Sequence, residues 1–160
     1  MPVALRSASA ARVERLVERP LRGIARSAGT LYLLDEQWLY AGPLRDPSAT
    51  SFFTAGEFGR LLDARMLRVQ GSLGVVVGTT GIAVFELSGN GPARPLARLR
   101  TPAIGSVADA AIVGERVFLV GERGLLVLDP RSGRIVVSVD VDGRASLGVA
   151  VFRFRPFWFR

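Results

Sequence analysis

"VFLVGERGLLVLDPRSGRIVVSVDV", residues Val117–Val141, is the stretch of sequence that decides the fold. Its apolar runs are short, and each ends at the Gly, Pro or charged residues that are typical of hairpin turns. With the run Val107–Ile112 before it, the stretch predicts a meander of β-strands at 107–112, 117–120, 125–129 and 135–140. The second and third runs are apolar at almost every position, which is typical of strands covered on both faces.

The same pattern occurs once before in the chain. Glycines 43 positions apart pair Gly71 with Gly114, Gly78 with Gly121, and Gly81 with Gly124. The apolar positions keep the same register: Val69 with Ile112, Val75 with Phe118, Val76 with Leu119, Val77 with Val120, Ile82 with Leu125, Val84 with Val127 and Phe85 with Leu128. A four-stranded meander repeated every ~40–45 residues is typical of a β-propeller blade. We therefore predict an all-β fold of two to three four-stranded antiparallel propeller-type blades, with an N-terminal helix.

The segment "VADAAIVGERVFLVGERGLLVLDPRSGRIVVSVDV" (107–141) resembles the LVIVP-type and related quinoprotein-like propeller repeats. The shared features are a strand, a turn, an aromatic-containing strand, a glycine, and an apolar strand that ends in Leu128-Asp129. The resemblance covers about residues 64–152 and implies a fold rather than an activity. The Trp docking pattern of quinone-binding propellers is missing, so we expect no cofactor.

The predicted organisation has three parts: an N-terminal helical segment (1–26), a propeller-like β domain (27–155) and an aromatic and Arg-rich tail (156–160). The β domain divides into blades at about 27–63, 64–106 and 107–148. The first of these blades rests on spacing alone, with predicted strands at Gly29–Asp35 and Trp38–Tyr40. Within Pro43–Asp63 we expect a loop, followed by a short helix at Ala55–Arg65.

The N-terminal segment contains "SAARVERLVE" (Ser9–Glu18), which has a Ser cap and is followed by Pro20. This pattern predicts a helix. Its apolar side either docks on the sheets or the helix stays solvated.

Composition excludes several kinds of chemistry. All 21 cationic residues are Arg, and the chain has no Lys, no His and no Cys. Zinc sites of the usual His/Cys kind, Ser-His-Asp and Cys-His nucleophiles, Lys Schiff bases and disulfides are therefore excluded. An enzyme or ligand-binding fragment of the propeller type would have to use carboxylates such as Asp109, Asp129 and Asp140 at the ring mouth.

Two further patterns favour turns over ligand sites. Asp140 and Asp142-Gly143, preceded by Ser138, resemble part of a calcium loop, but position twelve is Val149 instead of Glu. The glycines Gly71, Gly74, Gly78 and Gly81 resemble a phosphate loop by number alone, since no Lys follows them. We expect no metal site and no nucleotide site.

The C-terminus "VAVFRFRPFWFR" concentrates aromatic and cationic side chains. Through Arg155 the two kinds alternate, as in a strand of a further blade or one that closes the ring, and Pro156 should end that strand. The end, Phe157–Arg160, is predicted to anchor at a membrane surface or in a groove of a partner. The candidate interaction residues are Phe152, Arg153, Phe154, Arg155, Phe157, Trp158, Phe159 and Arg160.

The most plausible function from sequence is a non-catalytic binding or assembly module, a scaffold subunit of a larger complex. Two or three blades do not close a ring, so a second copy, another protein or a longer chain must cover the open faces. The net charge of +7 favours an acidic protein or an anionic membrane surface as partner, and nucleic acid is a weaker expectation. Neither a signal peptide nor a transmembrane helix is expected, which favours a cytoplasmic or membrane-peripheral location.

Overall fold

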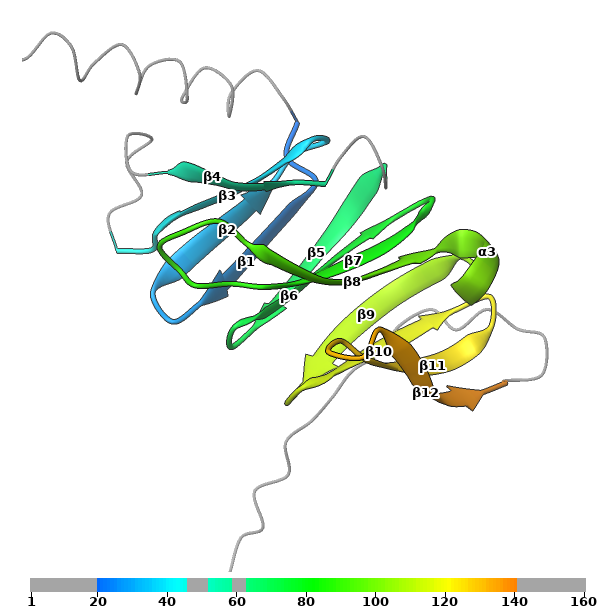
Figure 1. Cartoon of the computed structure of the whole chain (residues 1–160). Coiled ribbons are helices and arrows are strands. Elements are labelled where there is room, and N and C mark those ends of the chain that lie inside the picture. The colour runs from blue at the N-terminus through cyan, green and yellow to red at the C-terminus, as the bar shows by residue number, and fades with distance from the viewer. Residues whose placement is uncertain (1–19, 46–51, 59–62, 141–160) are drawn as a thin grey trace, which may run out of the picture.

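The computed structural model describes residues 20–45, 52–58 and 63–140, which form three four-stranded antiparallel sheets (Figure 1). Each sheet is a meander of consecutive strands, and we call it a blade. Blade 1 contains β1 (Gly23–Ser27), β2 (Thr30–Leu34), β3 (Trp38–Pro43) and β4 (Phe53–Glu57). Blade 2 contains β5 (Ala64–Gln70), β6 (Leu73–Gly78), β7 (Gly81–Glu86) and β8 (Arg94–Arg100). Blade 3 contains β9 (Val107–Val113), β10 (Arg116–Gly121), β11 (Gly124–Asp129) and β12 (Arg134–Val139).

The blades stack side by side in chain order. The first strands meet, since β1 contacts β5 and β5 contacts β9. The short helix α3 (Thr101–Ile104) connects blades 2 and 3. The predicted all-β fold of four-stranded antiparallel blades is confirmed, with three blades among the described residues. The predicted helix at Ser9–Glu18 lies outside the described residues.

The first hairpins show that the 43-residue repeat extends to blade 1. Their turns lie at Ala28-Gly29, Gly71-Ser72 and Gly114-Glu115, 43 positions apart each time. Gly71 and Gly114 have nearly the same φ, 59° and 58°. In blade 1 both turn residues have positive φ, 45° and 81°. Blade 1 therefore uses a different two-residue turn at the same position, with Ala28 in place of the glycine of the other two blades.

The second hairpins of blades 2 and 3 also match. Gly78 pairs with Gly81, and Gly121 pairs with Gly124, at the ends of equivalent strands. The predicted equivalence of Gly71 with Gly114 and of Gly78 with Gly121 is confirmed.

The predicted helix at Ala55–Arg65 is wrong where the structure describes it. Residues 53–57 form β4, which pairs with β3, and Ala64 begins β5. Ala55 is buried in the core, and without β4 the outer edge of β3 would be unpaired. The first sheet also begins earlier than predicted, because Gly23–Ser27 forms β1.

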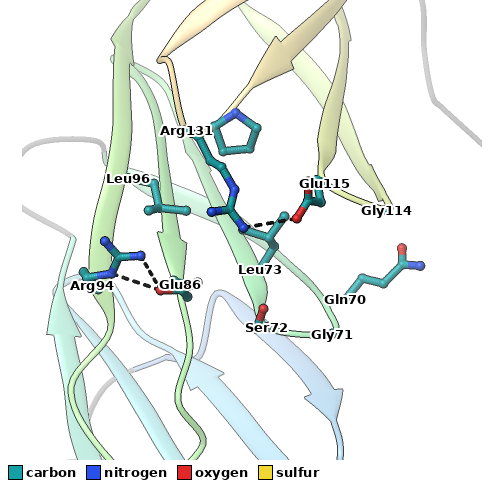
Figure 2. A pocket seen from close by; sticks show the side chains of 11 residues that line it. Gln70, Gly71, Ser72, Leu73, Glu86, Arg94, Leu96, Gly114, Glu115 and Arg131 are labelled. Carbon is teal, nitrogen blue, oxygen red and sulfur yellow. Dashed lines mark hydrogen bonds and ion pairs between the residues drawn. The ribbon is translucent and has the colours of Figure 1, made fainter.

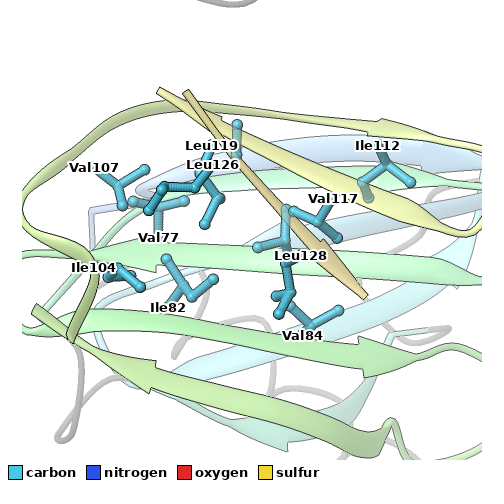
Figure 3. Close-up of a cluster of buried hydrophobic side chains, with 12 residues drawn as sticks. Val77, Ile82, Val84, Ile104, Val107, Ile112, Val117, Leu119, Leu126 and Leu128 are labelled. Atoms are coloured by element: carbon cyan, nitrogen blue, oxygen red, sulfur yellow. The ribbon is translucent and has the colours of Figure 1, made fainter. Parts of the chain in front are cut away.

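Two apolar clusters hold the three blades together. The first lies between blades 1 and 2, and the second between blades 2 and 3 (Figure 3). In blade 2 the side chains of Val76 and Phe85 belong to the first cluster, while those of Val75, Val77 and Val84 belong to the second. The continuous apolar runs of the sequence are thus explained, since β6 and β7 are buried on both faces.

Candidate functional site

The internal packing defines two kinds of blade face. We call the side of a blade that faces the next blade along the chain its trailing face, and the opposite side its leading face. At the interface of blades 2 and 3, the trailing face is Val75, Val77, Ile82 and Val84, and the leading face is Ala110, Ile112, Val117, Leu119, Leu126 and Leu128. At the interface of blades 1 and 2, the trailing face is Tyr32, Leu34, Leu39 and Ala41, and the leading face is Leu67, Val76, Ala83 and Phe85.

The leading face of blade 1 has no blade before it among the described residues. Ile24, Leu33 and Tyr40 lie opposite one another on neighbouring strands and so share this face. Ile24 is 67% exposed, whereas its repeat equivalents in blades 2 and 3, Leu67 and Ala110, are each 2% exposed. An apolar position that is core in two blades is therefore open to solvent in the first.

The trailing face of blade 3 is the corresponding open face at the other end. Phe118 and Leu125 are half-buried there, although their blade 2 equivalents, Val75 and Ile82, are fully buried. On the outermost strand, Val137 and Val139 are 47% and 46% exposed. Closer to the middle of the sheet, Val120 and Val127 are buried.

Exposed apolar side chains are confined to the two end blades. Among the residues that the structure describes, the exposed large hydrophobic side chains are Leu21, Ile24, Val136, Val137 and Val139. These lie on β12, on β1 or just before β1, and none lies on the middle blade. The pattern marks the ends of the stack as incomplete interfaces.

Asp35 is a structural residue whose role the sequence analysis did not assign. Its fully buried carboxylate accepts hydrogen bonds from the backbone N–H groups of Gln37 (2.6 Å) and Trp38 (2.5 Å) and from the Tyr40 hydroxyl (3.0 Å). It thereby fixes the turn between β2 and β3 and holds Tyr40 on the leading face of blade 1. The sequence contains a signal for this role. Asp35 directly follows a strand, and its carboxylate accepts a hydrogen bond from the N–H of the residue two positions later, which is typical of an Asx turn.

A groove lies between blades 2 and 3 at the end where their first hairpins turn (Figure 2). Its volume is about 460 Å³. Two ion pairs line it: Arg94 contacts Glu86 with an N–O distance of 2.5 Å, and Arg131 contacts Glu115 at 3.1 Å. Because each cation has a carboxylate partner, the groove is close to neutral and suits a small polar or zwitterionic group better than a strong anion.

The predicted ring-mouth carboxylates do not come together. Asp109 lies near the start of β9 and pairs with Arg68 of blade 2 at 3.0 Å, while Asp129 ends β11, which runs in the same direction as β9. The two carboxylates are thus at opposite ends of blade 3, and Asp140 follows the last residue of β12.

Asp129 is held by Arg116 at 2.8 Å. The hydrogen bond from Arg116 lowers the pKa of Asp129, and the backbone N–H of Arg131 adds to this effect, which desolvation partly opposes. Within residues 20–45, 52–58 and 63–140, no group of three or more acidic, His or Cys side chains is placed to hold a metal ion.

The predicted interaction residues of the tail, Phe152 to Arg160, lie outside the described residues. No helix in the described part of the chain is long and apolar enough to span a bilayer.

Comparison with known proteins identifies the fold. No family model and no curated protein sequence matches the chain. Among solved structures, the chain is similar to the computationally designed protein Ika4, with a TM-score of 0.61 and 12% identity over 85% of this chain and 82% of Ika4. It is also similar to the designed protein Ika8, with a TM-score of 0.59 and 12% identity over 84% of this chain and 41% of Ika8. The WD40 domain of Pan2 from Neurospora crassa has a TM-score of 0.56 and 12% identity over 82% of this chain and 41% of that one.

WD40 domains are built from four-stranded propeller blades. The chain therefore has a propeller-type fold, as predicted. It spans most of Ika4 but less than half of the Ika8 and Pan2 chains. At 12% identity these similarities concern the fold alone.

Proposed function

We propose that the chain is a non-catalytic binding and assembly module, a propeller-type scaffold subunit whose open blade faces are covered by a partner. The observation that carries the proposal is that, among the described residues, the exposed large apolar side chains lie on or next to the two end blades. Ile24 is the clearest case, because its equivalents Leu67 and Ala110 are buried. We also propose that the blades belong to the LVIVP-type group of propeller repeats, on the strength of the sequence pattern at 107–141.

Burial of the exposed apolar side chains would contribute to the stability of a covered state. Burying one Val, Leu or Ile side chain contributes roughly 1.5–3 kcal/mol. Ile24, Val137 and Val139 together thus offer several kcal/mol to a partner that covers them, before the cost of association is subtracted. Propellers usually have four to eight blades, so the three blades of the described residues do not by themselves complete a ring.

The experiment that tests this proposal measures association and exposure together. We expect the mass in solution to depend on protein concentration. We also expect the amide hydrogens of β1 and β12 to become more protected from exchange as the protein associates. A monodisperse monomer with a cooperative thermal transition and no such change in protection would contradict the proposal.

A second candidate function is ligand binding in the groove between blades 2 and 3, where two Arg–Glu pairs line a volume of about 460 Å³. A thermal-shift screen with small zwitterionic compounds tests it. A compound that raises the melting temperature of the wild type but not of Arg131→Ala would support binding there. An equal shift in both proteins would place binding elsewhere.

The tail is proposed as a contact with anionic membrane surfaces, on the basis of its aromatic and Arg composition. Aromatic rings suit the interface of a bilayer, and the arginines add attraction to anionic headgroups.

A further inference from the structure

We propose that the partner of each open face is a second copy of this chain. The trailing face of blade 3 would pack on the leading face of blade 1 of the other copy, and two such contacts would close a six-bladed ring. This inference rests on the proposed assembly function and specifies its partner and geometry.

The repeat provides the first argument. At both internal interfaces a trailing face packs on a leading face, and the residues that form these faces recur 43 positions apart. On the open trailing face, Phe118 and Leu125 take the places of Val75 and Ile82. On the leading face of blade 1, the exposed Ile24 takes the place of Leu67, the half-buried Leu33 that of Val76, and the buried Tyr40 that of Ala83. A contact between blade 3 and a second blade 1 would thus continue an interface that the chain already makes twice.

The number of blades provides the second argument. The described residues of each chain form three blades, and propellers typically contain four to eight. Six is the one multiple of three between four and eight, so two copies together would have the number of blades of a closed propeller. Head-to-tail contacts close into a ring when the rotation per copy allows it, and a two-membered ring has the commonest symmetry among homo-oligomers.

Charge distinguishes a second copy from the acidic partner favoured by composition. Two chains of net charge +7 repel each other, so their association depends on apolar contact. Added salt screens this repulsion and should strengthen the association of two copies. An acidic partner would show the opposite dependence on salt.

The test uses two variants, one on each open face. Ile24→Arg alters the leading face of blade 1, and Val137→Arg alters the trailing face of blade 3. Both side chains are largely exposed in the chain, at 67% and 47%, so the domain should still fold. Ser72→Arg adds the same charge at an exposed turn of the middle blade and serves as the control.

Light scattering after size-exclusion chromatography gives the masses. We expect twice the chain mass of 17.2 kDa for the wild type and for Ser72→Arg. Each face variant alone should have the mass of a single chain, because every contact in its ring would contain one altered face. A mixture of the two variants should associate more than either variant alone. One of its two contacts joins intact faces, the trailing face of Ile24→Arg and the leading face of Val137→Arg, while the other contact joins the two altered faces.

Several outcomes would overturn the ring. If the mixture associates no more than either variant alone at any concentration, the contact is not head-to-tail. If one variant keeps the double mass and the other loses it, the contact joins two faces of the same kind. Both results leave the assembly function standing. A wild type that is a single chain at every concentration would rule out the second copy and, with it, the assembly function proposed above.

Discussion

Replacing Gly121 with Ala tests how closely two backbones approach in blade 3. A Cβ at this position would lie 2.0 Å from the carbonyl oxygen of Ser106 and 2.9 Å from the Cα of Val107. These neighbours are backbone atoms, so no side-chain rotation can relieve the clash. The φ of Gly121 is outside the left-handed region, and the effect is therefore one of space alone.

The expected loss of stability follows from the backbone that must move to make room for the Cβ. The Ser106 carbonyl accepts a hydrogen bond of 2.9 Å from the N–H of Glu122, and the adjacent Val107 is buried in the cluster between blades 2 and 3. Moving Ser106 away weakens a hydrogen bond worth about 1 kcal/mol. Overpacking adds about 1–3 kcal/mol. We expect Gly121→Ala to lower the free energy of unfolding by about 3 kcal/mol, which corresponds to a fall in Tm of about 6–12 °C.

Two glycine variants provide matched controls. Gly114→Ala meets nothing within 4 Å but has a φ of 58°, so it should cost about 1–2 kcal/mol from backbone strain. Gly91→Ala meets the flexible Ser88 hydroxyl, 3.2 Å away, and should cost less than about 0.5 kcal/mol. Thermal and denaturant unfolding at one fixed protein concentration measures all three. If Gly121→Ala is no more destabilising than Gly114→Ala, the close approach described here is wrong.

Three other predictions concern Asp35, Asp129 and the tail. Asp35→Ala should lower the free energy of unfolding by about 2–4 kcal/mol, because the Tyr40 hydroxyl and two backbone donors lose their buried acceptor; equal stability to the wild type would contradict this. The lowered pKa of Asp129 means that its stabilising effect is present above the unfolded-state pKa and is lost as pH falls through the folded-state value; in NMR titration, Arg116→Ala should return this pKa toward 3.8, and an unchanged pKa would exclude Arg116 as the cause. Deleting residues 157–160 should weaken flotation with anionic vesicles, most clearly at low salt, while leaving Tm nearly unchanged; loss of folding with intact vesicle binding would show that the tail belongs to the core.

Two features made blades 2 and 3 predictable from the sequence. Blade 2 is packed on both faces, and both blades carry a glycine at the same hairpin turn. Burial on both faces produces the continuous apolar runs of β6 and β7, and Gly71 and Gly114 mark the same hairpin turn. Sequence reasoning missed β1 and β4, whose sequences "GIARS" and "FTAGE" have few large apolar residues. Backbone pairing with β2 and β3 places these two strands in the sheet, although they bury few large apolar side chains of their own.

The open faces were predictable as a consequence of an incomplete ring, but not as a set of residues. Whether Ile24 or Val137 faces solvent depends on the order in which the blades stack, and sequence periodicity does not contain that order. The groove could not be predicted either. Its Arg131–Glu115 pair joins two turns of blade 3 that are separated along the chain and meet only after the sheet has formed.

Each blade completes its own hydrogen-bonded sheet, because no sheet in the described structure contains strands of two blades. The blades are joined mainly by side-chain packing, with a few polar contacts such as that of the Ser27 hydroxyl with the Gly71 carbonyl at 2.7 Å. A cut between blades therefore breaks no strand ladder, and a strand need not be exchanged when such units join. In the proposed two-copy ring, whole chains could therefore exchange without breaking any strand ladder. Joining two copies end to end in one gene would make that ring a single polypeptide without changing a strand.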